Sequence, residues 1–372
     1  MPAARRSRRV CRSARVSRSV VGVAVVAALA VTSACSKARS SVVPATGAPS
    51  SGVSSSSPAN SASAPPSSSA SAAPSSGADP LTGLPETASA AKRPALAVKV
   101  DNVLGAWPQA GLNYADIVWD LPVEGGLTRL LAIFHSQDVP LVGPIRSARP
   151  VDSDILPLFG HTYYAFSGGT PSDLNPIADH SGATAMWWDV TPSLFVTRTD
   201  HKVPHQVFAT SSMLYAGGQA RKPSTTPPPA VFSYSPSPVS GSTPATSVTA
   251  SYPSATASWA WDGTKYLRTQ NGNPDMLMDN GQVSSSNVVV MSVAVQATGA
   301  RDSHGSVVPL PMVIGTGTVW VFRNGTVIKG IWNRPKLGSP LKLVTSSGAT
   351  ITLSPGRTWV EVLPNSSQPA IH

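Results

Sequence analysis

Cysteine is nearly absent from the chain, which contains only Cys11 and Cys35 among its 372 residues. Both lie within the first 35 residues, which are predicted below to form a secretion signal that is cleaved before Cys35. The mature chain would then hold no free thiol and no disulfide. This distribution excludes a cysteine metal site and cysteine-based catalysis from the rest of the protein.

Acidic residues are absent before Asp79, whereas seven arginines lie in the first 18 residues and are followed by Lys37 and Arg39. These nine basic residues account for most of the net charge of +10. Without them, 19 of the 28 Lys and Arg residues remain against 18 Asp and Glu residues. A near-neutral chain lacks the basic surface that binds a phosphate backbone, so a nucleic-acid partner is disfavoured.

A hydrophobic run long enough to cross a bilayer, which takes roughly 20 residues, is also missing. The apolar run at residues 20–31 follows a basic start and precedes small residues, the order typical of a secretory signal. Because it ends in "TSAC", it resembles a bacterial lipoprotein signal, although Thr32 stands where leucine is usual. We expect residues 1–35 to be this signal, with Cys35 lipidated, for example by palmitate, and holding the protein on the outer face of the cell membrane. An ordinary secreted protein is the alternative.

Residues 36–78 consist almost entirely of Ser, Ala, Pro, Gly and Val and contain no aromatic residue. Such a segment buries too little apolar surface to offset its ordering entropy, so a disordered tether is predicted. The remaining length is typical of two domains. We place them at residues 79–220 and 250–364, with a Pro- and Ser-rich connection at 221–249 and a tail at 365–372.

The two halves differ in their predicted secondary structure. In the first half, four apolar runs bounded by turn residues are predicted strands, at residues 95–102, 115–121, 129–135 and 162–169. Segments 150–160 and 171–180 open with proline followed by acidic residues and are predicted helices. In the second half, Asn324-Gly325 and Asp262-Gly263 between alternating runs predict hairpins. The expected fold class is α+β, with a mixed α/β N-terminal domain followed by a β-rich antiparallel C-terminal domain.

Motifs of familiar enzymes are missing. In "AFSGGT", Ala165 replaces the first glycine of a Gly-x-Ser-x-Gly elbow, so a serine hydrolase is not expected. No phosphate-binding or dinucleotide-binding glycine loop and no His-Glu-x-x-His motif occurs. His201 and His205 have the spacing of two ligands on one helix, but Pro204 between them disfavours a helix. We therefore expect neither a metal site nor a cofactor.

What remains is a series of polar residues within otherwise apolar sequence. Arg146 and Arg149 lie three residues apart in "GPIRSARP", directly before the predicted helix start at Pro150. Such a pair could grip a carboxylate or phosphate bidentately, aided by helical N–H groups. The alternative is that these arginines pair with nearby acids and brace loops. The candidate ligand-binding residues are Glu124, Arg129, Arg146, Arg149, Asp152, Arg198 and His205.

The stretch "DLPVEGGLTR" at residues 120–129 supplies the first two candidates. A turn alone explains its glycines, because glycine accepts backbone conformations that other residues avoid. It does not explain Glu124 and Arg129, so we interpret the stretch as the rim of a site.

Several strings resemble the YerB-like family of bacterial lipoproteins, domain of unknown function 3048. The most specific are "PVEGG" and "GPIRSARP", and others are "DPLTGLP", "HKVPHQVF" and "GTGTVWVFRNGTVIKGIWNR". The resemblance covers nearly all of residues 79–364. It implies two family domains in tandem and a lipid-anchored, extracytoplasmic location, but it supplies no activity. Gln206 departs from the family's pattern, where asparagine is expected, and keeps a side-chain amide.

These observations favour a membrane-anchored, non-catalytic binding or scaffold lipoprotein that recognises an anionic group of a cell-wall component or envelope protein. Two alternatives remain. One is an envelope-polymer hydrolase that uses Glu124 and His205 as acid and base, and its glycosidase version requires carboxyl groups within about 10 Å of one another. The other is a purely structural assembly lipoprotein, in which the charges only brace turns.

Overall fold

The computed structural model describes residues 74–278, 281–302 and 305–372. The predicted signal, Cys35 and nearly all of the predicted tether lie outside the described residues. The last residues assigned to the tether, Pro74–Ala78, form strand β1, which pairs with β2 at Pro85–Thr87. The prediction of disorder up to residue 78 is wrong there, because backbone pairing at a strand edge needs no apolar side chain. In the described part, no helix combines the length and apolarity needed to cross a bilayer.

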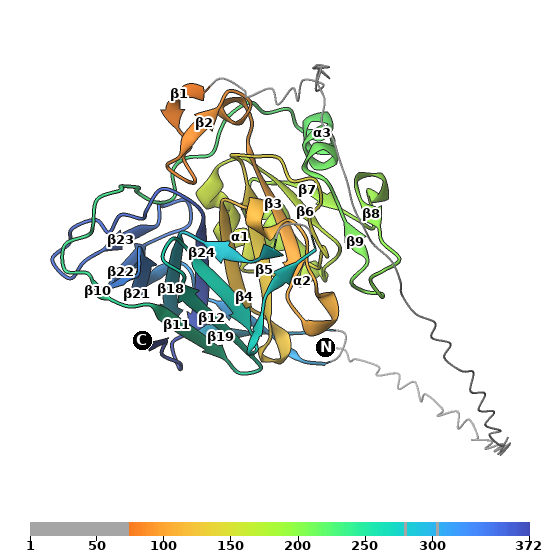
Figure 1. The fold of residues 1–372 in the computed structure, drawn as a ribbon. Helices are drawn as coiled ribbons and strands as arrows, with labels where there is room; N and C mark the ends of the chain where they lie inside the picture. The colour runs from red at the N-terminus through yellow and green to blue at the C-terminus, as the bar shows by residue number, and fades with distance from the viewer. Residues whose placement is uncertain (1–73, 279–280, 303–304) are drawn as a thin grey trace, which may run out of the picture. The chain divides into compact units, whose positions relative to one another are not determined.

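One sheet of eleven strands takes strands from both predicted halves (Figure 1). The first half contributes β3 (Ala95–Asp101), β4 (Ile117–Pro122), β5 (Thr128–Phe134), β6 (Thr162–Phe166) and β7 (Thr184–Trp187). The predicted connection contributes β10 (Thr243–Pro244). The second half contributes β18 (Asn287–Val293), β21 (Gly315–Arg323), β22 (Thr326–Arg334), β23 (Lys342–Val344) and β24 (Thr358–Pro364). The order is β10-β22-β21-β18-β24-β4-β5-β3-β6-β7, and β23 also pairs with β22.

Strand β24 joins the two halves. It pairs in parallel with β18, from Asn287↔Thr358 onward, and in parallel with β4, from Thr358↔Ile117 onward. The expected antiparallel arrangement of the second half is therefore wrong at this strand. Hairpin signals report only pairs that are close in sequence, as at Asn324-Gly325 between β21 and β22, so they could not reveal this pairing.

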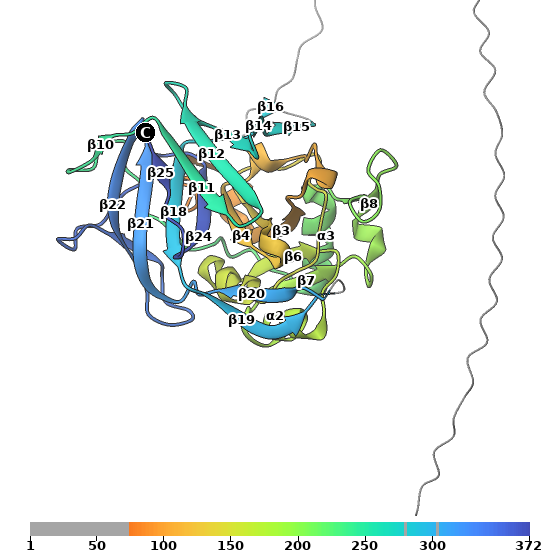
Figure 2. The same ribbon diagram turned by 90° about the horizontal axis from the view of Figure 1, so that it is seen from below.

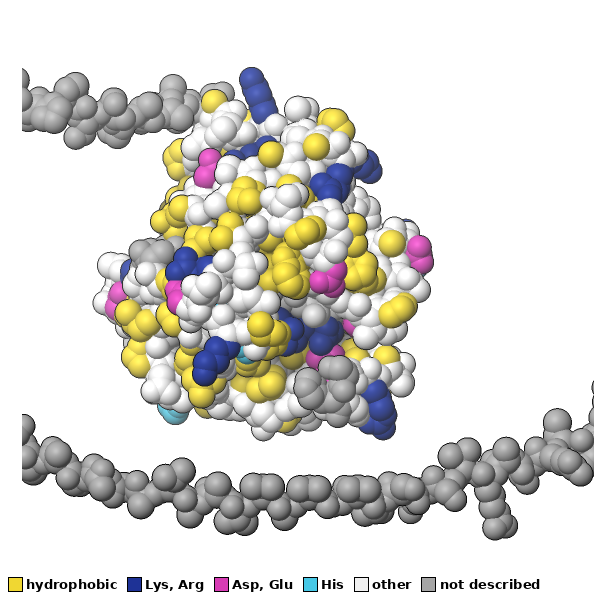
Figure 3. Space-filling model, turned by 90° about the vertical axis from the view of Figure 1, so that its right-hand side faces the viewer, with side chains coloured by type: hydrophobic (Ala, Val, Ile, Leu, Met, Phe, Trp, Pro, Cys, Tyr) yellow, Lys and Arg dark blue, Asp and Glu magenta, His cyan; other side chains and the backbone are white. Residues whose placement is uncertain are grey.

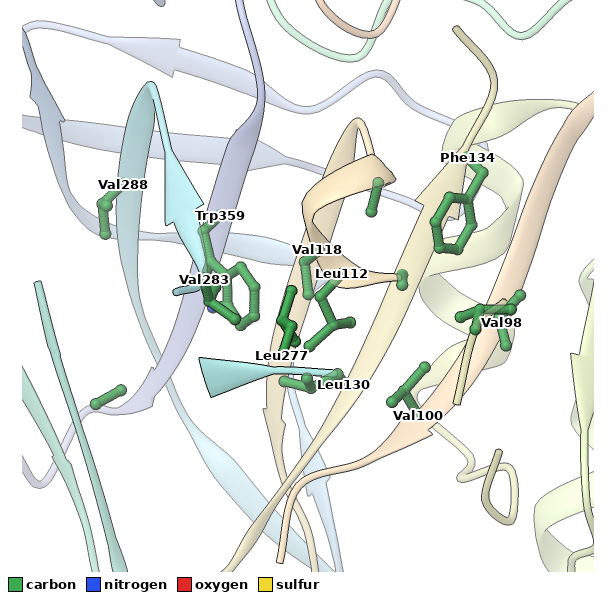
Figure 4. Close-up of a cluster of buried hydrophobic side chains, with 14 of the residues drawn as sticks. Val98, Val100, Leu112, Val118, Leu130, Phe134, Leu277, Val283, Val288 and Trp359 are labelled. Atoms are coloured by element: carbon green, nitrogen blue, oxygen red, sulfur yellow. The ribbon is translucent and has the colours of Figure 1, made fainter. Parts of the chain in front are cut away.

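Side chains of the large sheet alternate between two buried faces. Figure 4 shows part of the first face, where Val98, Leu130 and Trp359 come from three different strands. A second sheet covers this face (Figure 2), in the order β14-β13-β12-β11-β25 with β17 beside β13. Its strands are β11 (Ser247–Tyr252), β12 (Ala255–Trp261), β13 (Tyr266–Gln270), β14 (Asn273–Pro274), β17 (Ser284–Ser285) and β25 (Ala370–Ile371).

The other face is covered by helices and by part of the predicted connection. Helix α1 (Asp152–Ile155), the 3-10 turn η5 (Leu156–Phe159) and helix α2 (Pro171–His180) bury apolar side chains there. Val231 and Phe232 of the Pro- and Ser-rich connection are buried in the same cluster. Helix α3 (Ser211–Arg221) packs on the first face through Leu214. The described fold is thus sheet-rich, with few helices.

The remaining elements are short. The paired strands are β8 (Val196–Thr197) with β9 (Val207–Phe208), β15 (Met276–Leu277) with β16 (Gly281–Gln282), and β19 (Val295–Arg301) with β20 (Val307–Pro311). The 3-10 turns are η1 (Ala90–Lys92), η2 (Leu104–Ala106), η3 (Leu112–Tyr114), η4 (Glu124–Gly126) and η6 (Pro192–Leu194).

A buried ion cluster ties the second sheet to the large one. Arg268 of β13 lies 2.6 Å from Asp120 of β4 and also pairs with Asp275. Its guanidinium is 4.0 Å from Glu361 of β24 and 4.8 Å from the ring centroid of Trp359. All of these charged side chains are buried, so each depends on the others for compensation of its charge.

Replacement of Arg268 by methionine should therefore leave carboxylates buried without a cation. We expect Arg268→Met to lower the free energy of unfolding by roughly 3–5 kcal/mol, measured by urea denaturation at pH 7. Lys265→Met, at an exposed lysine three residues earlier, is the matched control. Equal urea midpoints for the two variants would show that the cluster contributes no stability.

Candidate functional site

The candidate residues lie at one edge of the large sheet. Strands β3, β4, β6 and β7 all run in the same direction, because β3 and β4 are each antiparallel to β5 while β6 and β7 continue in parallel. Their carboxyl ends, at Asp101, Pro122, Phe166 and Trp187, therefore meet at a common edge. In open α/β sheets, ligands bind in crevices outside this edge.

The turn η4 brings the first two candidates to this edge. Gly125 and Gly126 have φ angles of 70° and 72°, which let the chain reverse between β4 and β5. A side chain at Gly126 would also place its Cβ 2.7 Å from that of Pro253, so the backbone itself approaches the second sheet. Arg129 pairs across the strands with Leu121 and lies on the helix-covered face of the sheet.

Arg149 and Glu124 form a bidentate ion pair. Arg149 Nε lies 2.6 Å from Glu124 Oε1, and Nη2 donates to Oε2 at 2.9 Å. Asp173 of α2 is 4.0 Å from the same guanidinium. The expected help from helical N–H groups is absent, because α1 has four residues and the main-chain N–H of Arg149 donates to Asp152. Arg149 therefore pairs with a nearby acid, Glu124, as the alternative interpretation of the sequence predicted.

Asp152 is engaged within the core. Lys99 Nζ lies 2.6 Å from Asp152 Oδ1, and the Tyr164 hydroxyl donates to Oδ2 at 2.7 Å. Burial lowers the pKa of Lys99, and burial beside Asp152 raises that of Tyr164 well above its usual value. Asp152 therefore positions the loop that carries Arg149 and has its oxygen atoms occupied by protein groups.

Asp101 holds Arg146 and His205 together. Its Oδ2 lies 2.7 Å from Arg146 Nε and 2.8 Å from His205 Nδ1. Burial alone would raise the pKa of Asp101, but the hydrogen bond from His205 and the charges of Arg129 and Arg146 lower it below its usual value. Because Arg146 and His205 are partly exposed, these two side chains and Asp101 form the edge of the site that faces the solvent.

Arg129 differs from its neighbours, because its guanidinium forms no ion pair with any described residue. Its Nη1 donates to the main-chain oxygen of Ser147 at 2.9 Å, and its Nε has no hydrogen-bond partner in the described part. The residue is only 7% exposed. Burial and the nearby charge of Arg149 lower the pKa of Arg129 to about 10. Arg129 is thus a buried cation whose charge no carboxylate directly compensates.

The remaining candidates lie elsewhere or do not meet. Arg198 pairs with Asp200 at 2.5 Å, on an exposed segment, and no contact joins it to the other candidates. Because Glu124 is held by Arg149 and His205 by Asp101, no hydrogen bond joins Glu124 to His205 in the described part. His201 contacts Asp200 and the main-chain oxygen of Pro108. Glu124 and His205, the acid and base of the hydrolase hypothesis, are therefore bound to different partners.

Two cavities open beside this cluster. The smaller, of about 140 Å³, is lined by Glu124, Ser147, Arg149 and Asp173, among others. The other, of about 470 Å³, is lined by His205 together with Leu104, Trp107 and Val203. Figure 3, a view from the right-hand side of Figure 1, shows Lys and Arg side chains beside carboxylates with hydrophobic side chains around them.

Sequence reasoning missed Lys99, Asp101 and Asp173. A signal for the first two was present in "ALAVKVDN", where two charged residues alternate along an otherwise apolar strand and therefore share one face. Asp173 belongs to a capping box with Thr170 at the start of α2, which fixes it beside Arg149.

A separate cluster on the first strand pair was also missed. Asp79, Glu86 and His135 bring three possible metal-ligand atoms within 4.8 Å of one another. His135 Nδ1 lies 2.7 Å from Asp79 Oδ2, and Asp79 Oδ1 accepts from the main-chain N–H groups of Leu81 and Thr82. These contacts account for the aspartate of "DPLTGLP" as a residue that closes a turn.

Comparison with known proteins gives a consistent result. Residues 81–224 match the family described as "Protein of unknown function (DUF3048) N-terminal domain", and residues 247–360 match its C-terminal domain. "Putative lipoprotein YerB" of Bacillus subtilis is 26% identical over 302 residues, which cover 77% of this chain and 86% of that protein. The crystal structure of YerB has the same fold, with a TM-score of 0.69 and 24% identity over 79% of this chain and 99% of that chain.

Removal of the charge of Asp101 should release both of its partners. At pH 7 we expect Asp101→Asn to lower the free energy of unfolding by about 1.5–3 kcal/mol. The folded-state pKa of Asp101 lies below its unfolded value, so this contribution is present above about pH 4 and is lost as the pH falls through the folded-state pKa. Urea denaturation between pH 7 and pH 3 measures the difference, which should shrink toward low pH. Asp200→Asn, on the exposed segment, should leave the midpoint unchanged; a pH-independent loss in Asp101→Asn would contradict this assignment.

Proposed function

The chain belongs to the DUF3048 family, for which no activity is established, and we propose that it is a binding lipoprotein with an anion site at Arg129. The observation that carries the proposal is the buried guanidinium of Arg129, which forms no ion pair in the described part. The ligand is a carboxylate or phosphate group of an envelope component or a partner protein. No covalent step is part of the proposal.

A buried charge without a partner is unfavourable, because it has lost its hydration and gained no compensating interaction. Arg146 and Arg149 add to this cost through repulsion of Arg129. A bound anion would relieve both effects, since charge-assisted hydrogen bonds are stronger than neutral ones. The two positive charges that lower the pKa of Arg129, those of Arg146 and Arg149, would therefore also favour an anion.

The smaller cavity lies next to Arg129, although Arg129 is not one of its lining residues. Ser147, whose main-chain oxygen accepts from Arg129, lines this cavity together with Arg149 and the carboxylates of Glu124, Asp173 and Asp302. Its volume of about 140 Å³ is several times the share of one water molecule in the liquid, roughly 30 Å³. Because the guanidinium of Arg149 binds Glu124 and the main-chain oxygen of Ala148, it is held in place before a ligand arrives.

The neighbouring contacts bear on the two alternatives. In this cluster Arg146 and Arg149 are paired with acids, whereas Arg129, like the buried Arg323 and Arg334 elsewhere in the fold, is bound by main-chain oxygen atoms. An envelope-polymer hydrolase needs a free acid or base, whereas Glu124 is bound bidentately by Arg149.

The proposed location follows from the N-terminal sequence and from the relative. "TSAC" with Cys35 resembles a lipoprotein signal, and the similar protein of Bacillus subtilis is described as a putative lipoprotein. We propose that Cys35 carries the lipid and that the anion site acts outside the cytoplasm, close to the membrane surface. Mass spectrometry of the protein purified from membranes would detect the lipid on Cys35.

Inorganic phosphate is the simplest probe of the site. We expect phosphate to raise the melting temperature of the protein relative to chloride at equal ionic strength. At a concentration of 100 Kd the stabilisation should be about 2.7 kcal/mol. Arg129→Met should abolish this effect, and in chloride it should melt no lower than the wild type because a buried unpaired charge has been removed.

Arg198→Met is the matched control, since Arg198 is an exposed arginine outside the cluster. It should keep the full phosphate effect. Differential scanning calorimetry measures all three proteins under the same conditions. If phosphate leaves the wild type unchanged, or if Arg129→Met retains the shift, the proposed anion site is wrong.

A further inference from the structure

The large sheet ends at β7, and the outer edge of this strand pairs with no other described strand. β7 is the last strand in the order and pairs in parallel with β6. Directly after β7, the main-chain N–H of Trp188 donates to the end of β6 at 3.0 Å. Along a strand, successive residues direct their main-chain groups to opposite sides. Because Trp188 bonds to β6, Ala185 and Trp187 direct their N–H groups away from β6, toward the outer edge.

These outward groups are available for pairing. Among the described residues, no donor or acceptor contacts the N–H and oxygen of Ala185 or the N–H of Trp187, and Ala185 is exposed. The oxygen of Trp187 accepts from the N–H groups of Val190 and Thr191, which turn the chain away. Strand β7 contains no proline and no charged residue, whereas β10, at the opposite end of the sheet, contains Pro244. Proline and charged side chains keep edge strands from pairing, and β7 has neither.

A third cavity, of about 520 Å³, lies beside this edge. It is lined by Ala185 and Trp187 of β7 and by Leu174 and Ile177 of α2, and the ring of Phe166 stacks on that of Trp187 with centroids 6.2 Å apart. Side chains of an extended chain alternate between two faces. A strand added to β7 would therefore direct every second side chain toward this apolar cavity.

The charge of the cavity indicates what else such a strand would carry. Of the described lining residues, only Arg221, at the end of α3, is charged. Its Nη1 donates to the main-chain oxygen of Gly217 at 3.0 Å, and it forms no ion pair with any described residue. A cation beside an apolar cavity favours a binding partner with a complementary negative charge.

We propose that the outer edge of β7 binds an extended peptide segment of a partner protein by strand addition. The outward main-chain groups of Ala185 and Trp187 supply the backbone pairing, which gives this mode of binding its affinity. The cavity takes alternate aliphatic or aromatic side chains, which give specificity, and Arg221 favours an acidic residue in the segment. A small apolar molecule would fill the cavity but leave the backbone groups unpaired. This site is separate from Arg129 and does not depend on the anion site.

Hydrogen exchange in the free protein tests whether the edge is unpaired. The N–H of Met186 is directed to β6, whereas those of Ala185 and Trp187 are not. Amide exchange followed by NMR should therefore be at least about tenfold faster at Ala185 and Trp187 than at Met186. Equal protection of the three amides would show that the edge is already paired and would overturn the inference.

A phage-displayed library of random heptapeptides, selected against the purified protein, supplies the binding probe. Enriched sequences should carry apolar residues at alternate positions together with an acidic residue. A synthetic copy should slow amide exchange at Ala185 and Trp187. N-methylation of the alternate peptide nitrogens that face β7 should weaken binding at least about tenfold, whereas N-methylation of the intervening nitrogens should have a smaller effect.

Substitutions at Ala185 test the same contact from the side of the protein. Ala185→Pro removes the outward N–H and leaves the bonds to β6 in place, so it should weaken binding of the synthetic peptide at least about tenfold in isothermal titration calorimetry. Ala185→Val, the matched control, adds similar bulk but keeps the N–H and should retain most of the affinity. Arg221→Gln should weaken an acidic peptide by about two- to fivefold and leave its neutral version unchanged.

The outcomes separate this inference from the proposed function. If selection yields no peptide whose binding depends on Ala185, or if Ala185→Pro binds as tightly as Ala185→Val, the inference is wrong. The N-methylated peptides make the same test on the wild-type protein if Ala185→Pro does not fold, as judged by circular dichroism. Phosphate binding at Arg129 is measured independently, so the proposed function stands or fails by its own result.

Discussion

The candidate site depends on one constraint, which is that the buried charge of Arg129 has no ion-pair partner among the described residues. A guanidinium that is 7% exposed has lost most of its hydration, and its Nε has no partner in the described part of the chain. The nearby carboxylates bind other side chains, Glu124 binding Arg149 and Asp101 binding Arg146 and His205. These carboxylates act on Arg129 only at longer range, and none forms an ion pair with it. A site that must hold such a charge is more stable with an anion than without one.

The ten-residue stretch that carries Arg129 also anchors the large sheet. Asp120 faces the second sheet, where it binds Arg268, whereas Arg129 faces the helices on the opposite side. The hairpin of β4 and β5 therefore connects the ion cluster around Arg268 in the core with the cluster of arginines and acids at the edge. Because β24 pairs with β4 and supplies Glu361 to the core cluster, the second half of the chain supports the strand that ends at the site. The carboxyl end of β4 at the candidate site is therefore held by its pairing with β24 and by the buried ion cluster, an arrangement that favours a preorganised binding site.

Local features of the fold were predictable, and long-range ones were not. The expected helix at residues 171–180 has the bounds of α2, because its proline start and capping acid act within one turn. The parallel pairing of β24 was not predictable, since its partners lie about 70 and 240 residues away and parallel pairs leave no hairpin signal. At the site, the polar residues themselves were recognisable within apolar sequence, and Glu124 was among the acids considered as partners of the arginines, but spacing could not choose between the possible pairs. Sequence spacing favoured Arg146 with Arg149 as a pair, whereas tertiary contacts give Arg149 to Glu124 and Arg146 to Asp101.

Observation of the Arg129 Nε–H group in solution tests the central claim most directly. In the nitrogen-15 NMR spectrum of arginine side chains, Arg129→Met identifies the Arg129 signal by its disappearance. The account predicts that this signal shifts saturably as inorganic phosphate is added at constant ionic strength, because phosphate supplies the partner that Nε lacks, while the Arg198 signal stays in place. An Arg129 signal that remains unmoved at phosphate concentrations that shift other arginines would contradict the account.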